Sequence, residues 1–339
     1  MKLFSLILLS LCTQISFAAT LINGAGATFP FPLYSKWFSE YQKINSEVQI
    51  NYQSIGSGGG IRQFSDKTVD FGASDAPMTD EQMQKAGAPV VHIPTVLGAV
   101  VAVYNISGVQ SGLKLTPEAL SAIFLGEIKK WEDPRLTKLN PELKLTGDII
   151  VVHRSDGSGT SAVFTDYLSK VSPAWKEKVG QGTAVNWPVG LGGKGNEGVA
   201  GLVKQTPGSI GYVEFVYAEF NNLSYANLKN KTGKFVTPSL ASVTSAATAS
   251  IKAMPEDFRI SITNAEGPGA YPLSSFTYLL VWRDTPDAEK GGQLVKFLNW
   301  AIKDGQKLAS ELKYSPLPKS LVAKIEAKIK TLTFGKQKG

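Results

Sequence analysis

The chain has 339 residues, of which 43% are hydrophobic and 19% are charged, the composition of an ordinary soluble protein with sizeable cores. This length favours two domains over one. The net charge of +7 fits an anionic ligand, or simply solubility. Nucleic acid is not expected as a partner, because the Lys and Arg residues are spread along the sequence and no nucleic-acid motif accompanies them.

The first eighteen residues, MKLFSLILLSLCTQISFA, have the three parts of a secretory signal peptide. Lys2 supplies the positive start, an apolar run follows as far as Cys12, and small residues precede a cleavage site after Ala18 or Ala19. The apolar run is shorter than the roughly 20 residues that a membrane span needs. The residue before Cys12 is a leucine rather than a small residue, which argues against a lipoprotein signal.

The only cysteine lies in this signal, so the mature chain is expected to have none. Disulfides, thiolate metal sites and cysteine nucleophiles are therefore excluded from the mature protein. The two histidines, His92 and His153, are too few for a His-rich metal centre and argue against a Ser-His-Asp triad. Neither a metal nor another cofactor is expected.

Beyond the signal, β-rich runs alternate with helical patterns, which predicts an α/β protein with mainly parallel or mixed sheets. Strands are expected over residues 48–55, 98–106, 148–155, 208–215 and 276–283. Helices are expected over residues 31–43, 60–68, 116–126, 161–171, 291–305 and 320–332, the last as a terminal amphipathic helix. Residues 216–271 have little periodicity and predict long loops and short helices.

Three stretches lead from a Gly/Ser/Thr-rich turn into a helix: NGAGATFPFPLYSKW (23–37), SIGSGGGIRQF (54–64) and VVHRSDGSGTSAVF (151–164). A helix N-terminus offers unpaired N–H groups and a positive dipole end to an anion. One such turn alone is an ordinary helix cap. Three in one chain favour an anion site, since Arg154 also precedes Ser158 and suits bidentate contact with an oxyanion. Asp156 is expected to hold the Arg154 guanidinium in place.

Two other motifs fit enzymes poorly. GSGTS is not a hydrolase elbow, because Asp156 stands two residues before Ser158 where that motif needs glycine. GLGGKGNEG (190–198) is not a Walker A loop, because Gly195 follows Lys194 where Ser or Thr is required. It is interpreted as a glycine-rich loop, with Lys194 an open candidate for the cleft.

Over nearly the whole mature chain the sequence resembles the phosphate-binding proteins of ABC-type phosphate importers. The resemblance rests on GAGATFPFPLYSKW, IGSGGG, VDFGASDAP, FLGEIKKW, RSDGSGTS, WPVGLGGKGNEGV and GSIGYVE. It implies an α/β, two-lobed periplasmic binding protein fold of type 2-like topology, with two hinge crossings and dehydrated phosphate in the cleft between the lobes.

The resemblance also implies a set of phosphate-binding residues: Thr28, Phe29, Ser57, Asp75, Arg154, Ser158, Gly159 and Thr160. The first four would come from one lobe and the others from the second. Two positions depart from the family pattern. Gly58 stands where a second serine is frequent, which should alter loop flexibility more than the ligand set. His153 stands where an arginine can occur, which should weaken the positive field slightly.

The domain organisation implied by the resemblance is discontinuous. Residues 1–18 form the signal peptide, residues 19–104 with 272–339 form lobe I, and residues 105–271 form lobe II. The chain would cross between the lobes near Val103–Asn105 and near Pro272–Thr277, and these two crossings would act as a hinge.

Asp75, in VDFGASDAPMTD, is unexpected in an anion site, because its small neighbours cannot shield it and include no Lys or Arg. A carboxylate accepts a hydrogen bond from protonated phosphate but repels sulfate, which carries no proton near neutral pH. The hypothesis is that Asp75 excludes sulfate. The alternative is that Asp75 caps a helix at APMTDEQMQK, and the two roles are compatible.

The expected function is reversible capture of inorganic phosphate in the periplasm and delivery to an ABC-type permease in the inner membrane, by a monomer without enzymatic activity. Arsenate is a further candidate ligand. One alternative is an exported phosphatase or phosphoryl transferase, for which only Ser57, Ser158 or Thr160 with His92 or His153 could supply a nucleophile and a base. Another is a surface adhesin that retains the fold.

Overall fold

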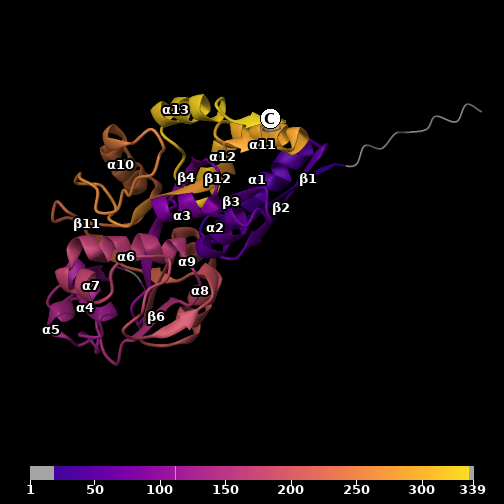
Figure 1. The fold of residues 1–339 in the computed structure, drawn as a ribbon. Helices are drawn as coiled ribbons and strands as arrows, with labels where there is room; N and C mark the ends of the chain where they lie inside the picture. The colour runs from indigo at the N-terminus through magenta and orange to yellow at the C-terminus, as the bar shows by residue number, and fades with distance from the viewer. Residues whose placement is uncertain (1–18, 111, 336–339) are drawn as a thin grey trace, which may run out of the picture.

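The computed structural model describes residues 19–110 and 112–335, and the expected signal peptide lies outside these ranges. The described chain folds into two lobes stacked one above the other (Figure 1). Both contain helices packed on strands, as expected for an α/β protein. Within the described ranges, no helix combines the length and the apolar character that a membrane span requires.

A nine-stranded sheet runs through both lobes. Along its hydrogen-bonded path the strands are β2 (Val48–Ser54), β1 (Thr20–Gly26), β3 (Phe71–Ser74), β12 (Ser274–Trp282), β4 (Val90–Asn105), β8 (Ser209–Glu214), β6 (Ile150–Arg154) and β7 (Leu191–Gly193), and β9 (Ser224–Tyr225) pairs with β4 beside this path. The pairs at both ends, β2–β1–β3 and β8–β6–β7, are parallel, whereas β12 and β4 are antiparallel to their neighbours.

Strand β4 connects the two lobes. Its residues Val90–Ala99 pair with β12, and its residues Val100–Asn105 pair with β8, so the strand changes partner between Ala99 and Val100. At this change Gly98 packs under the Phe29 ring, where an added Cβ would lie 2.6 Å from Phe29 Cζ. Every residue of β4 except Asn105 is buried.

The helices cover the sheet in two groups (Figure 1). The upper lobe carries α1 (Phe31–Ile44), α2 (Ser57–Ser65), α3 (Asp80–Ala86), α10 (Leu240–Ser250), α11 (Ala288–Ala301), α12 (Gln306–Ala309) and α13 (Lys319–Ile329). The lower lobe carries α4 (Pro117–Phe124), α5 (Pro134–Thr137), α6 (Gly159–Val171), α7 (Pro173–Lys178), α8 (Gly195–Gln205) and α9 (Phe215–Asn221).

Smaller elements complete the described chain. Strands β11 (Phe235–Val236), β10 (Asn227–Lys229) and β5 (Lys114–Leu115) form a three-stranded sheet, and β13 (Asp284–Thr285) pairs with β14 (Thr333–Phe334). Two 3₁₀ turns, η1 (Ile251–Ala253) and η2 (Ser310–Leu312), follow α10 and α12. Helix α10 packs against β4 and β12.

Each expected strand and helix is present, most of them within a few residues of their predicted bounds, but β4 begins eight residues before the predicted 98–106, and β1, β3 and α8 are among the elements that were not predicted. Strands β1 and β3 are rich in Gly and Ala, so they lack the β-branched pattern of the other strands. Gly24 is required in β1 because a Cβ there would lie 2.0 Å from the Phe71 ring. Helix α8 begins inside the stretch 190–198, so the interpretation of that stretch as a loop was wrong.

Candidate anion-binding site

The three predicted turns all lead into helices that begin at the cleft: α1, α2 and α6. The eight predicted site residues are all buried, and contacts join them across the two lobes. Gly159, at the start of α6, faces Ser57 and Asp75 so closely that a Cβ there would lie 2.3 Å from Ser57 Oγ and 2.4 Å from Asp75 Oδ2. Residues that lie far apart in the sequence therefore meet where the two lobes touch.

Backbone contacts also close the cleft. The Gly58 N–H donates to the Gly157 carbonyl at 2.8 Å. A Cβ at Gly58 would lie 3.0 Å from Gly157 Cα, so glycine at position 58 lets the two backbones approach each other closely. Gly58 thus contributes to the fit between the lobes.

Three tyrosines hold the turn between β1 and α1. Their hydroxyls donate to three consecutive carbonyls of the turn: Tyr52 to Ala27 at 2.8 Å, Tyr217 to Thr28 at 2.6 Å and Tyr314 to Phe29 at 2.6 Å. The bonds from Tyr52 and Tyr314 hold the Ala27 and Phe29 carbonyls in place, and the bond from Tyr217 orients the Thr28–Phe29 peptide group in the closed arrangement. Tyr217 comes from α9, so one of these bonds crosses between the lobes.

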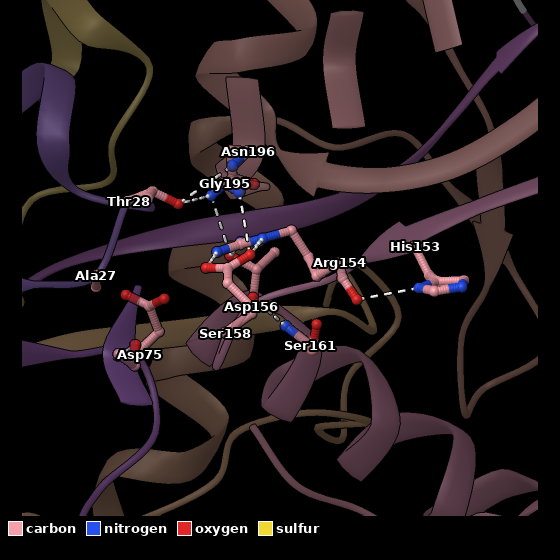
Figure 2. Close-up of polar contacts among 12 residues, drawn as sticks. Ala27, Thr28, Asp75, His153, Arg154, Asp156, Ser158, Ser161, Gly195 and Asn196 are labelled. Carbon is pink, nitrogen blue, oxygen red and sulfur yellow. Dashed lines mark hydrogen bonds and ion pairs between the residues drawn. The ribbon is translucent and has the colours of Figure 1, made fainter. Parts of the chain in front are cut away.

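Arg154 ends β6, and its side chain is only 1% exposed. Its Nε and Nη2 atoms donate to the two carboxylate oxygens of Asp156 at 2.7 and 2.6 Å, the contact by which Asp156 would hold the guanidinium in place (Figure 2). Partial burial acts to raise the pKa of Asp156, but the hydrogen bonds and charge of Arg154, together with backbone N–H donors such as that of Gly195, outweigh it and lower that pKa. The Nη1 atom lies 3.4 Å from Thr160 Oγ1, on the side of the α6 turn.

Ser158 is the N-cap of α6, and its Oγ accepts a bond from the Ser161 N–H at 3.0 Å. The Ser158 N–H donates to the Thr183 carbonyl at 2.8 Å, which fixes the turn before the helix. Gly159 and Thr160 then form the first turn of α6, where helix N–H groups and the dipole favour an anion.

Asp75 follows β3 and is 2% exposed. Its Oδ1 accepts a bond from Thr277 Oγ1 at 2.9 Å, while its Oδ2 is buried without a hydrogen-bond partner. Burial raises the pKa of Asp75 to about 7, although Thr277, Arg154 and Ser57 act to lower it. A buried oxygen without a donor is costly, so Oδ2 is suited to a ligand that brings an O–H group.

The alternative role of Asp75 and one expectation about its surroundings were wrong. Helix α3 is capped by Thr79, whose side chain forms a capping box with Gln82, so Asp75 does not cap it. Asp75 is also well shielded despite its small neighbours, because Gly159, Thr277 and Ser57 approach it from distant parts of the chain.

Comparison with known proteins places this geometry in a family. The model of the PBP superfamily domain matches residues 14–304. The phosphate-binding protein PstS of Haemophilus influenzae is 45% identical over 333 residues, which cover 98% of this chain and 99% of that protein. PstS of Xylella fastidiosa strain Temecula1 is 48% identical over 308 residues, covering 90% and 84%.

The chain belongs to the PstS family.

Solved structures agree with this family at the level of the fold. A high-affinity periplasmic phosphate-binding protein solved with phosphate has a TM-score of 0.72 at 21% identity, covering 91% of this chain and 93% of that one. A phosphate-binding protein from Stenotrophomonas maltophilia has a TM-score of 0.70 at 20% identity, covering 91% and 93%. The two-lobed periplasmic binding protein fold expected from the sequence is thereby confirmed.

The two histidines of this PstS family member have other partners. His153 lies beyond Arg154 from Asp75 (Figure 2), with its ring stacked on Trp187 at 4.9 Å. His92 accepts a bond from the Met78 N–H at 3.0 Å, and burial lowers its pKa to about 4. Neither histidine contacts Ser57, Ser158 or Thr160, and the described residues contain no cluster of three or more metal-ligating side chains.

Asn196 was not predicted from the sequence. It lies in the first turn of α8, is fully buried, and contacts both Thr28 and Thr160. The available signal was the Gly-Asn pair after a short glycine-rich strand, which is also a helix start. Lys194, the residue considered for the cleft, is the exposed N-cap of the same helix.

Gly159→Ala is expected to weaken anion binding by about 100-fold or more, because the new methyl group would collide with Ser57 and Asp75 and hold the lobes apart. The measurement is a calorimetric titration of phosphate. Gly201→Ala, in α8 with nothing within 4 Å of its Cβ position, is the matched control and should bind as the parent does. Equal affinity of both variants would contradict the close contact at Gly159.

Proposed function

We propose that this chain binds inorganic phosphate reversibly in the periplasm and delivers it to an ABC-type permease in the inner membrane. The observation that carries the proposal is Asp75 Oδ2, a buried acceptor without a partner that faces Gly159 at the N-terminus of α6. Protonated phosphate has both groups that this arrangement can bind: anionic oxygens for the helix start and Arg154, and an O–H donor for Asp75.

In this proposal the ligand contacts are Thr28, Phe29, Ser57, Asp75, Arg154, Ser158, Gly159 and Thr160. Asp75 excludes sulfate, because sulfate has no proton to donate and its charge meets that of the carboxylate. Arsenate shares the protonation pattern of phosphate and is expected to enter. Family relatives are named as phosphate-binding proteins, which supports the ligand and a transport role rather than catalysis.

The proposed working unit is a monomer with two moving lobes, residues 19–104 with 272–339 and residues 105–271. The two proposed crossings fall on β4 and at the start of β12. Opening would separate Gly159 from Asp75 and release the ligand to the permease. Within residues 105–271, α10 packs against β4 and β12, so this helix would stay with the upper lobe during opening.

Titration calorimetry with phosphate, arsenate and sulfate across pH tests the proposal. Phosphate and arsenate should bind one per chain and raise the melting temperature, since a ligand of the folded state stabilises it by RT ln(1 + [L]/Kd). Sulfate at the same concentration should shift it little at pH 8. No heat and no thermal shift with phosphate would reject the proposal, and sustained hydrolysis of a chromogenic phosphomonoester by pure protein would reject a transport-only role.

A further inference from the structure

The start of α8 contains a buried amide that contacts two of the proposed ligand residues without being one of them. Asn196 Nδ2 donates to Thr28 Oγ1 at 2.7 Å and to Thr160 Oγ1 at 3.1 Å. Thr28 follows β1 of the upper lobe, and Thr160 lies in α6 of the lower lobe, so the amide joins the two lobes. Figure 2 shows Asn196 beside Thr28. We infer that Asn196 is a positioning residue that turns both threonine hydroxyls toward the bound anion; the inference rests on the proposed function.

The orientation of the amide follows from its other side. Asn196 Oδ1 accepts a bond from the Glu214 N–H at 2.8 Å, which requires the oxygen to face β8. The NH₂ group must then face the cleft, where its two hydrogens serve one threonine each. Asn196 is fully buried, so water does not compete for these bonds.

The hydrogen bonds that the two threonine hydroxyls accept leave each hydroxyl hydrogen free to donate to a ligand. Thr28 Oγ1 accepts from Asn196 Nδ2 and from the Asn196 backbone N–H at 3.3 Å. Thr160 Oγ1 accepts from Asn196 Nδ2 and from Arg154 Nη1 at 3.4 Å. A hydroxyl has two lone pairs and one hydrogen, so with both lone pairs occupied each hydroxyl is a donor to whatever lies in the cleft. Two donors aimed in advance suit an anion and cost no reorientation when it binds.

The same bonds couple ligand binding to closure. Asn196 stays attached to the lower lobe through Glu214, while its bonds to Thr28 form only when the lobes meet. Closure therefore forms the interlobe hydrogen bond and at the same time turns the Thr28 hydroxyl toward the ligand. Loss of Asn196 should speed ligand release more than it slows capture.

Asn196→Ala and Asn196→Asp test this role by phosphate titration and stopped-flow release. Removing the amide should weaken binding by roughly 10- to 100-fold, since hydrogen bonds to a charged ligand would lose their alignment. Asn196→Asp keeps the acceptor for the Glu214 N–H but replaces the NH₂ donor by an oxygen, which would draw the threonine hydroxyls away from the ligand. The Asp variant should therefore bind phosphate at least as weakly as the Ala variant.

A double-mutant cycle separates positioning from simple packing. If Asn196 acts through the hydroxyls, Asn196→Ala should cost severalfold less affinity in a Thr28→Val or Thr160→Val background than in the parent. An unchanged cost in both backgrounds would overturn the inference. Asn140→Ala removes another fully buried asparagine of the lower lobe, whose amide donates to the Lys114 and Leu136 carbonyls, and it should lower stability without changing phosphate affinity.

The outcomes distinguish this inference from the function on which it rests. A parent chain that binds no phosphate would reject both together. A parent that binds phosphate, with Asn196→Ala and Asn196→Asp within about twofold of it, would overturn the role of Asn196 and leave the proposed function standing.

Discussion

Asp75→Asn is expected to admit sulfate, with a gain in sulfate affinity on the order of 10²–10³-fold at pH 8. The substitution removes the charge that repels sulfate and offers an amide that can donate to an unprotonated oxygen. Phosphate should still bind, because Arg154 and the α6 turn remain. Competition titrations of both anions at pH 8 measure the selectivity ratio. Negligible sulfate binding with unchanged phosphate affinity would reject the role of Asp75.

The parent chain should lose the same selectivity in acid. Burial raises the pKa of Asp75 to about 7. Above pH 7 the carboxylate is ionised and repels sulfate, and sulfate affinity should fall about tenfold per pH unit. Below pH 7 the carboxyl is protonated and can donate to a sulfate oxygen, so sulfate affinity should rise and level off near pH 6. The Asp75→Asn variant, which has no proton to gain at this position, should show a flat profile.

Arg154→Lys is expected to weaken phosphate binding by about 100- to 1,000-fold, although the charge is kept. Lysine cannot hold Asp156 with two parallel bonds and also present donors to the ligand. The Asp156 carboxylate, no longer neutralised by close contact, would then add repulsion near the anion. The measurement is phosphate calorimetry at pH 8 and low salt.

Arg259→Lys provides a matched control for this substitution. Arg259 pairs with Asp257, also two residues away in the sequence, through Nε at 2.7 Å, but it is a quarter exposed and contacts none of the eight proposed ligand residues. Phosphate affinity within about twofold of the parent is expected. Similar losses in both variants would mean that Arg154 acts through general charge or stability rather than through the ligand.

The helix starts of the site were predictable because their signals are local. Glycine, serine and threonine before an amphipathic run mark α1, α2 and α6 in the sequence itself, and the pair Arg154–Asp156 lies within three residues. The burial of Asp75 was not predictable, because Thr277 is 202 positions away and reaches it only through the pairing of β12 with β3. Asn196 escaped notice for the same reason, since its partner Thr28 is 168 positions away.

The strands of the fold also differ in whether their sequence signal is local or depends on distant neighbours. Strands rich in Val, Ile and aromatic residues could be predicted from their composition. Strands β1 and β3 could not, because their glycines and alanines are small to make room for the Phe71 ring and for close packing between strands. Such positions are shaped by a neighbour in space, and composition alone does not reveal that neighbour.

Strand β4 joins the two lobes in one continuous hydrogen-bonded sheet. The first part of this sixteen-residue strand pairs with β12, and its second part pairs with β8. Neither lobe therefore contains a complete sheet without the other. A fragment cut between the lobes would expose the backbone edge of β8 or of β12, which invites pairing with other chains. In the proposed opening, motion between the lobes would bend this shared strand, together with the start of β12, rather than swing a flexible linker.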